Sequence, residues 1–355
     1  MMNPDCVHAS TALLGPGLDA ADGVSIRIED GTISDIEVGV DPGADDLDLD
    51  GITLLPGFID THVHIGFWPP IEVLVGGVTT VRDLAWPPEQ IYPLVHRSRS
   101  PDFEGPEIVA AGPMLTCPAG YPVAAAWAPP GTARIVTDVD DARSAVRERV
   151  AEGAVIVKVA LNPAVGPTLS EEVLQAICDE AHSCGLEVTG HVFGIGELEK
   201  AIRCGMDELA HMLMSSDRIA DSTIDEMVAR GMRIVPTLAI HRSRTKRATI
   251  INLSRFVHAG GRIIYGTDLG NAGVHPGIEP NEIDRMARSE MSPTAILASA
   301  TVEAAAALRL KDRGVLASGY RADIIGVRGD PTDAPIVLKD LVFVMRGGIV
   351  RRLDT

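Results

Sequence analysis

Two histidines separated by one residue are the first feature of this chain that could do chemistry. His62 and His64 end the segment Leu54–His64, an apolar run interrupted by Pro56 and Gly57. Such a run predicts a short buried strand entered through a turn. Residues i and i+2 of a strand point to the same side, so both imidazoles would face one way. Two such imidazoles can chelate a divalent metal, although the pair alone could equally be packing or surface histidines.

The segment that contains this pair alternates short apolar strands with amphipathic helices, which is typical of a parallel α/β fold. The predicted strands are Gly57–His64, Val78–Leu84, Ile108–Ala111, Val155–Ala160, Glu187–His191, Glu208–His211, Arg233–Thr237 and Ile263–Thr267. The predicted helices include Asp138–Glu152, Glu171–Cys184, Glu197–Cys204, Asp221–Arg230 and Pro293–Leu308. Eight strands favour a (β/α)8 TIM barrel over a doubly wound sheet, and the chemistry of such barrels lies at the C-terminal ends of the strands.

The ends of these strands carry further residues that could bind metal. The fourth, fifth, sixth and eighth strands end at or near Lys158, His191, His211 and Asp268. With His62 and His64, they would place a set of candidate ligands at one rim of one barrel. A convergence of this kind is hard to attribute to chance.

The sequence patterns at both ends of the chain predict β-strands and no helices. Val24–Ile28 alternates before the turn Glu29–Gly31, and Leu341–Met345 precedes a turn at Gly347–Gly348. We expect a small β-sandwich domain built from residues 1–55 and 312–355, and a barrel domain of residues 56–311.

Composition and charge narrow the class of protein. The 355 residues are 46% hydrophobic and 23% charged, which is typical of a globular chain with a large core. The formal net charge is -18 and no long basic run is present, so nucleic acid is not an expected partner. No apolar stretch approaches the roughly 18 residues needed to span a bilayer, and residues 1–25 show no secretory signal. Five scattered cysteines fit reduced thiols, so we expect a cytoplasmic protein without a membrane partner.

The ordered motifs resemble the amidohydrolase superfamily, above all its prolidase-like and imidazolonepropionase-like branch. The residues that carry the resemblance are Pro56–His64, Gly77–Asp83, Val157–Val159, His191, His211, Gly266–Asp268 and Gly314–Ile324. The resemblance covers nearly the whole chain. It implies a (β/α)8 barrel, a β-sandwich from both termini and metal-dependent hydrolysis.

The resemblance also implies a role for each ligand. One metal ion would be held by His62, His64, Lys158 and Asp268, and a second by Lys158, His191 and His211. A buried lysine beside cations should have a lowered pKa, and its neutral amine can capture carbon dioxide as a carbamate that bridges both ions. The alternative is a lysine that snorkels or pairs with a carboxylate. Zinc is the expected metal, with manganese and cobalt as alternatives.

Two adjacent cations would lower the pKa of a bridging water, whose hydroxide attacks a carbonyl carbon polarised by one of the ions. Asp268 would accept the proton of the water and deliver it to the leaving nitrogen, first as general base and then as general acid. The alternative for Asp268 is a turn aspartate before Gly270.

Loops after the third and seventh strands contain candidates for substrate binding. Tyr121 and Trp127 belong to a loop rich in proline and glycine that could form a wall or lid. The Tyr121 hydroxyl could donate to the scissile carbonyl, and plain packing is the alternative. His241 and Arg242 could hold a substrate carboxylate, since guanidinium binds carboxylate bidentately, and a solvated helix start is the alternative.

We therefore predict a binuclear metal-dependent amidohydrolase that cleaves an amide or related C–N bond of a small molecule. A dipeptide, an N-acyl amino acid or a cyclic amide is the expected substrate. The alternative enzyme is a lactone or phosphotriester hydrolase, because the same hydroxide attacks those centres. The alternative from another class is a catalytically silent scaffold. The segment Ile65–Gly76 is short, which also leaves open a homo-oligomer whose partner chain completes the mouth of the barrel.

Overall fold

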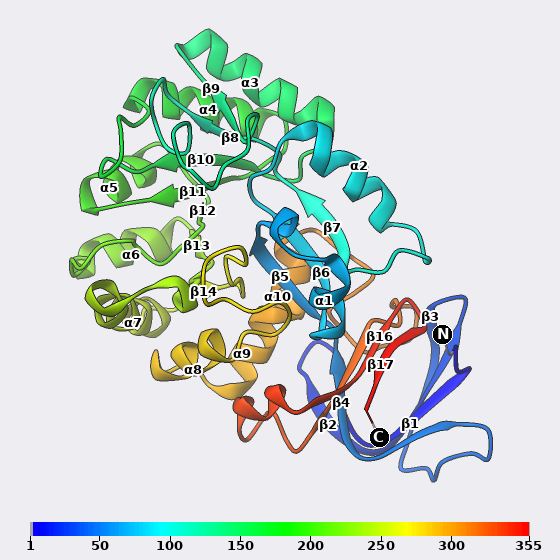
Figure 1. Cartoon of the computed structure of the whole chain (residues 1–355). Helices are drawn as coiled ribbons and strands as arrows, with labels where there is room; N and C mark the ends of the chain where they lie inside the picture. The colour runs from blue at the N-terminus through cyan, green and yellow to red at the C-terminus, as the bar shows by residue number, and fades with distance from the viewer. Residues whose placement is uncertain (1–2, 355) are drawn as a thin grey trace.

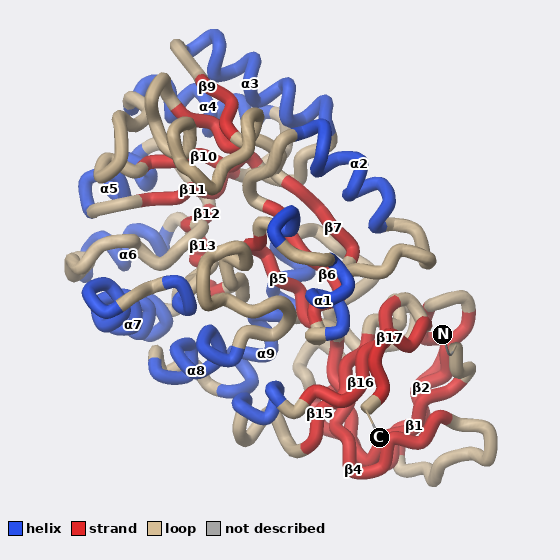
Figure 2. Tube along the Cα trace, viewed as in Figure 1, coloured by secondary structure: helices blue, strands red, loops and turns tan. Residues whose placement is uncertain are grey.

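The computed structural model describes residues 3–354, without the side chains of Ser243 and Arg244. The chain forms a parallel α/β barrel and, beside it, a β-sheet domain to which both termini belong (Figure 1). The strands of the terminal domain gather at the lower right in Figure 2, apart from the helices that surround the barrel. The predicted fold class, a TIM barrel with a β-sandwich domain, is confirmed.

The terminal domain is a sheet whose strands lie in the order β17-β16-β15-β4-β1-β2-β3. Its strands are β1 (Cys6–Leu14), β2 (Asp19–Glu29), β3 (Thr32–Val38), β4 (Leu47–Pro56), β15 (Ile324–Arg328), β16 (Leu341–Arg346) and β17 (Ile349–Leu353). The two chain ends join where β15 pairs antiparallel with β4. Alternate residues such as Val24, Ile26 and Phe343 bury their side chains in one core, because successive strand residues face opposite sides. The exact domain boundaries stay a prediction.

The barrel strands run parallel in chain order. They are β5 (Phe58–Val63), β6 (Val78–Asp83), β7 (Glu107–Ala110), β10 (Val157–Leu161), β11 (Val188–Val192), β12 (Glu208–Leu209), β13 (Arg233–Ile234) and β14 (Arg262–Ile263). Backbone hydrogen bonds close the ring between its two sheets. The Val155 N–H donates to the Ala110 carbonyl at 3.0 Å, and the Thr61 N–H donates to the Tyr265 carbonyl at 3.1 Å.

The structure differs from the prediction in detail. The strands β8 (Met114–Thr116) and β9 (Ala133–Ile135), which were not predicted, extend the sheet beside β10. The last three barrel strands are shorter than expected, although ladder bonds continue beyond them, as from the Ala210 N–H to the Gly190 carbonyl at 2.9 Å.

The helices are α1 (Pro70–Val75), α2 (Pro88–Ser98), α3 (Val139–Glu152), α4 (Glu171–Ser183), α5 (Ile195–Arg203), α6 (Asp221–Ala229), α7 (Ser243–His258), α8 (Pro280–Arg288), α9 (Pro293–Ala300) and α10 (Val302–Ala307). Short 3-10 turns occur at η1 (Ile65–Phe67), η2 (Leu238–Ile240) and η3 (Pro335–Lys339). The single helix predicted over Pro293–Leu308 is wrong. Thr301 interrupts it at φ -127° and ψ -96°, and its hydroxyl donates to the Leu297 carbonyl, a bond that competes with the helix. None of the helices within residues 3–354 has the length and hydropathy to cross a membrane.

Candidate metal centre

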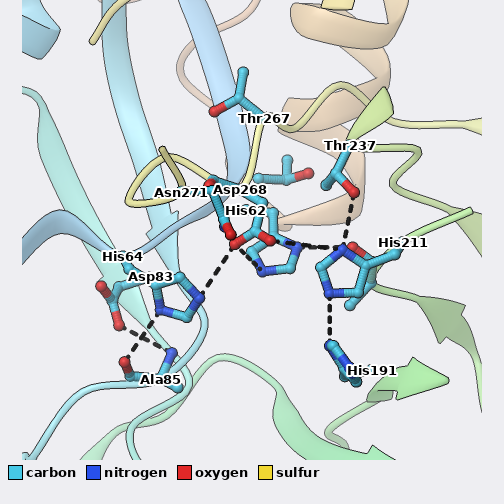
Figure 3. A network of polar contacts seen from close by, with 12 residues as sticks. His62, His64, Asp83, Ala85, His191, His211, Thr237, Thr267, Asp268 and Asn271 are labelled. Carbon is cyan, nitrogen blue, oxygen red and sulfur yellow. Dashed lines mark hydrogen bonds and ion pairs between the residues drawn. The ribbon is translucent and has the colours of Figure 1, made fainter. Parts of the chain in front are cut away.

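Side chains from five barrel strands or their C-terminal loops meet at one rim of the barrel (Figure 3). They line a cavity of about 350 Å³, and each is buried. These side chains are His62, His64, Lys158, His191, His211 and Asp268. The structure therefore brings together every metal ligand proposed from the sequence, while their roles stay a prediction.

Asp268 lies between the two histidines of the first barrel strand. Its Oδ1 atom is 3.3 Å from His62 Nε2 and 3.2 Å from His64 Nε2. Ligand atoms around a tetrahedral ion with bonds of about 2.0–2.1 Å lie about 3.3–3.4 Å apart, so these atoms are spaced as ligands. Within the described residues, Asp268 Oδ1 is also a buried atom without a hydrogen bond of good geometry. A cation at this point would satisfy it.

Backbone carbonyls decide which nitrogen of each histidine faces the cavity. His62 Nδ1 lies 2.7 Å from the Ala210 oxygen, and His64 Nδ1 lies 3.2 Å from the Ala85 oxygen. A carbonyl oxygen only accepts hydrogen bonds, so each Nδ1 must carry the proton. The Nε2 lone pairs then face Asp268, which is the tautomer that a metal ligand needs.

Burial and charge set the protonation states of this cluster. Burial lowers the pKa of His62 and His211 well below the ordinary value, and it lowers the pKa of His191 to about 3. Burial alone would raise the pKa of Asp268, but the imidazoles of His62, His64 and His211 outweigh it and hold that pKa well below its usual range. Burial alone would lower the pKa of His64, but Asp268 outweighs burial and raises that pKa above its ordinary value. The site thus combines three neutral imidazoles with an ionised carboxylate and the His64 ring beside it, and imidazole and carboxylate are donor types that bind zinc.

Lys158 is a fully buried side chain on β10 that lines the cavity. Burial lowers its pKa to about 7, with Asp268 opposing the shift and Arg82 adding to it. A large fraction of the amine is therefore uncharged near neutral pH. The charges of Asp268 and Glu208 favour its protonated form, so pairing with a carboxylate stays an alternative.

His191 and His211 face each other across the other side of the cavity. His191 Nδ1 lies 3.0 Å from His211 Nε2, and His211 Nδ1 lies 2.8 Å from the Thr237 hydroxyl. The remaining nitrogen, His191 Nε2, lies 3.2 Å from the Asn162 side-chain amide. A cation between the facing nitrogens would need a lone pair from each, so His191 would then carry its proton on Nε2. The sequence reading missed Thr237 and Asn162, because single polar residues in loops have no characteristic spacing.

Arg82 and Asp83, at the end of β6, brace the neighbouring strand β5. Arg82 Nε donates to the Thr61 carbonyl at 2.7 Å, and its Nη2 donates to Glu208 Oε1 at 2.5 Å. Asp83 accepts from the Ile65 N–H at 2.8 Å. These contacts hold the backbone on both sides of His62 and His64.

The rest of the cavity wall is mainly apolar and aromatic, with Asn271 as a polar residue among the described lining. Tyr121 stacks on the His191 ring at 4.8 Å and accepts a hydrogen bond from Trp127 Nε1 at 3.0 Å. Trp127 lies 5.1 Å from the His64 ring. The short segment after β5 contributes Phe67 to this wall, a residue that the sequence reading missed because it fits no spacing pattern. The predicted wall of Tyr121 and Trp127 is thus present in the cavity.

The two other candidates for substrate binding are not among the described residues that line the cavity. His241 is buried, its Nδ1 lies 3.3 Å from the Thr245 hydroxyl, and burial lowers its pKa to about 4. Arg242 is exposed, and its Nη2 donates to the Ala272 carbonyl at 2.8 Å. Their predicted role in binding a carboxylate stays a prediction.

Comparison with known proteins gives the family. A sequence model described as the amidohydrolase family matches residues 71–353. An uncharacterized protein of Mycobacterium tuberculosis is 29% identical over 372 residues, which cover 94% of each chain. Imidazolonepropionase of Deinococcus deserti is 29% identical over 188 residues, 51% of this chain and 44% of that protein. The crystal structure of a Xaa-Pro dipeptidase with bound methionine shares the fold, with a TM-score of 0.82 and 24% identity over 97% of this chain and 98% of that chain. Because the family model spans most of its length, the chain belongs to the amidohydrolase family.

Proposed function

We propose that this protein hydrolyses an amide or related C–N bond with two divalent cations. The observation that carries the proposal is the position of Asp268 Oδ1, which lies 3.3 Å from His62 Nε2 and 3.2 Å from His64 Nε2, beside a buried lysine whose pKa is lowered to about 7. One cation would be held by His62, His64, Lys158 and Asp268, and the other by Lys158, His191 and His211. Zinc is our first choice for both positions, with manganese and cobalt as alternatives.

Lys158 would act as a carbamate. Its uncharged amine attacks the carbon of carbon dioxide, an N–C bond forms, and one proton leaves to solvent. The carbamate would offer its two oxygens as further ligands for the cations. The low pKa of Lys158, about 7, supports this step because only the neutral amine is nucleophilic.

When bound, the cations would supply the charge that lowers the pKa of the attacking water and polarises the scissile carbonyl. Asp268, held ionised by its imidazole neighbours, accepts a proton from that water while the new C–O bond forms. It then delivers the proton to the leaving nitrogen as the C–N bond breaks, and the products are a carboxylate and an amine. The Tyr121 oxygen already accepts from Trp127, which leaves the Tyr121 proton for the substrate carbonyl.

Metal analysis tests the proposal. After dialysis against zinc, we expect about two equivalents of metal per chain, and hydrolysis in a panel of amides but not in metal-free protein. Isotope-labelled bicarbonate should give a carbamate signal by NMR. Lys158→Met should lose that signal and at least half of the metal, whereas Lys311→Met, which changes an exposed lysine, should keep both. A protein that takes up no metal and cleaves no amide would instead be a silent scaffold.

A further inference from the structure

We infer that this site takes neutral amides that carry an aromatic group, and not amino-acid derivatives with a free carboxylate. The inference rests on the proposed function and narrows its substrate class. It contradicts the dipeptides and N-acyl amino acids expected from the sequence, and it follows from the composition of the cavity wall.

The described lining of the cavity offers a carboxylate no cationic side chain beyond the proposed metal ligands. Among the described residues that line it, the charged side chains other than histidine are Lys158 and Asp268, and both are proposed metal ligands. The wall beyond the ligands is mainly apolar, with Phe67, Met114, Tyr121, Trp127, Met214 and Ile240, and the segment after Asp268 adds Gly270, Asn271 and Ala272, of which Asn271 is polar. With both proposed cations engaged by their ligands, the attacking water and the scissile carbonyl, a carboxylate against the apolar part of this wall would lose its hydration without gaining an ion pair from a side chain, which is strongly unfavourable.

The two residues expected to bind a carboxylate, His241 and Arg242, are not among the described residues that line the cavity. Arg242 is exposed, and its guanidinium donates to the Ala272 carbonyl at 2.8 Å. His241 is buried at 3% exposure and lies outside the cavity lining. Burial also keeps its imidazole neutral, since the pKa is lowered to about 4. Neither side chain is among the described residues that line the cavity, although Arg242 contacts one of them, Ala272.

Aromatic rings form one continuous part of the wall. The Trp127 ring lies 6.3 Å from Phe67, 6.1 Å from Tyr121 and 5.1 Å from His64. The indole N–H of Trp127 is already used by the Tyr121 oxygen, so its ring faces remain for apolar contact. Rings in this arrangement bind another ring by offset stacking or edge contacts. A cavity of about 350 Å³ has room for one such ring beside the amide.

The backbone next to Phe67 leaves room for this aromatic wall. Gly270 has φ 125°, and a Cβ atom there would lie 2.7 Å from Phe67 Cδ2. A larger residue would displace Phe67 from the cavity. Phe67 also packs edge to face against Trp86, with ring centroids 5.0 Å apart and an angle of 79° between the ring planes. The aromatic wall is therefore a supported feature and not a single loose side chain.

The test uses a matched pair, N-acetyl-phenylalanine and N-acetyl-phenethylamine, which differ by one carboxylate next to the scissile amide. For the zinc-loaded full chain, we expect kcat/KM to favour the neutral amide by at least about 100-fold. N-acetyl-propylamine, which lacks the ring, should be poorer than the phenethyl compound by about 10-fold. Trp127→Leu should remove most of this second preference and leave the metal content unchanged.

Binding provides a readout that does not depend on turnover. Calorimetry with the zinc-loaded Asp268→Asn variant should show the neutral amide binding at least about 10-fold more tightly than the acid. Equal or better binding and turnover of the acid would overturn the inference, and a loss of that turnover in Arg242→Met would identify the missing anchor. Preferential binding of the neutral amide without any turnover by the parent protein supports the inference and counts against the proposed hydrolysis. Turnover that favours the acid supports the proposed hydrolysis and counts against the inference.

Discussion

The Nδ1 nitrogen of His62 lies 2.7 Å from the carbonyl oxygen of Ala210. Ala210 directly precedes His211, so one hydrogen bond connects a candidate ligand on β5 to a candidate ligand after β12. The two imidazole rings lie 4.7 Å apart. Because the carbonyl fixes both the tautomer and the rotation of His62, the ligand set is organised by the barrel itself. The predictions below ask which contacts of this kind decide metal binding, turnover and stability.

Thr237→Val should weaken metal binding. The Thr237 hydroxyl lies 2.8 Å from His211 Nδ1, and valine removes this partner while keeping the shape of the side chain. Thr237 has a left-handed backbone, φ 44°, and valine is β-branched in the same way, so backbone strain should change little. We expect zinc affinity to fall about 10- to 100-fold, measured by competition with a chelator. Thr249→Val removes another buried threonine hydroxyl, one that donates to the Lys246 carbonyl, and should leave zinc affinity unchanged.

Asp268→Asn should abolish turnover while leaving the metal content nearly intact. The amide oxygen can still act as a ligand, but it cannot carry the proton from water to the leaving nitrogen. We expect kcat to fall by about 100- to 10,000-fold, and metal analysis should show nearly parental stoichiometry. The control is Asp217→Asn, which changes an exposed carboxylate. Turnover near the parental rate in Asp268→Asn would show that the proton is carried by another group.

Arg82→Met should strongly destabilise the barrel. Arg82 and Glu208 form an ion pair whose side chains are 1% and 0% exposed, and loss of the guanidinium leaves Glu208 with Arg233 at 3.6 Å. A buried charge deprived of its partner costs about 3–5 kcal/mol, measured by urea denaturation of the metal-free protein. The control Arg27→Met breaks an ion pair with Glu37 in which the side chains are 53% and 45% exposed. We expect no measurable change in stability for this variant. Similar results for both variants would refute the argument from burial.

Glu282 should make the protein less stable as the pH rises. Burial raises its pKa to about 8, Asp60 adds to the shift, and the Ala239 N–H and Arg285 oppose it. The unfolded chain releases this proton near 4.5, so the folded state binds more protons between pH 4.5 and about 8. The contribution of the neutral carboxyl is therefore fully present below pH 4.5 and is lost as the pH rises through about 8.

Glu282→Gln removes this titration and keeps the shape of the side chain. The variant should gain stability relative to the parent as the pH rises, by on the order of 2–4 kcal/mol, in urea denaturation at about pH 5 and about pH 8. Glu226→Gln alters an exposed carboxylate that pairs with Arg230, and it should show no such change with pH. A gain of the same size at both pH values would mean that the carboxyl does not titrate in this window.

The fold class and the proposed ligands could be predicted because their signals are local in the sequence. Each barrel strand is a short apolar run, and His191 stands at the end of such a run, so the rule for parallel barrels places its side chain at the rim. The same reasoning failed at Thr301, where the continuous apolar pattern of Pro293–Leu308 hides a hydroxyl that bonds to Leu297 and ends α9.

The cavity wall could not be predicted in the same way. Met114, Met214 and Ile240 are ordinary apolar residues, and nothing in their spacing distinguishes a cavity wall from a core. Their common position depends on how strand β8, the 3-10 turn η2 and the segment after β12 pack together, which is a property of the folded chain. The charge of Arg242 was visible in the sequence, but its hydrogen bond to the Ala272 carbonyl was not.

The Asp268 N–H donates to the His62 carbonyl at 2.7 Å, across the seam where the last barrel strand meets the first. These two residues stand near opposite ends of the barrel segment, so a chain still emerging from the ribosome presents the histidines long before the acid exists. A partly synthesised chain therefore contains only part of the candidate ligand set. If the proposed metal centre forms, full metal uptake would follow late in synthesis and would report that the barrel has closed.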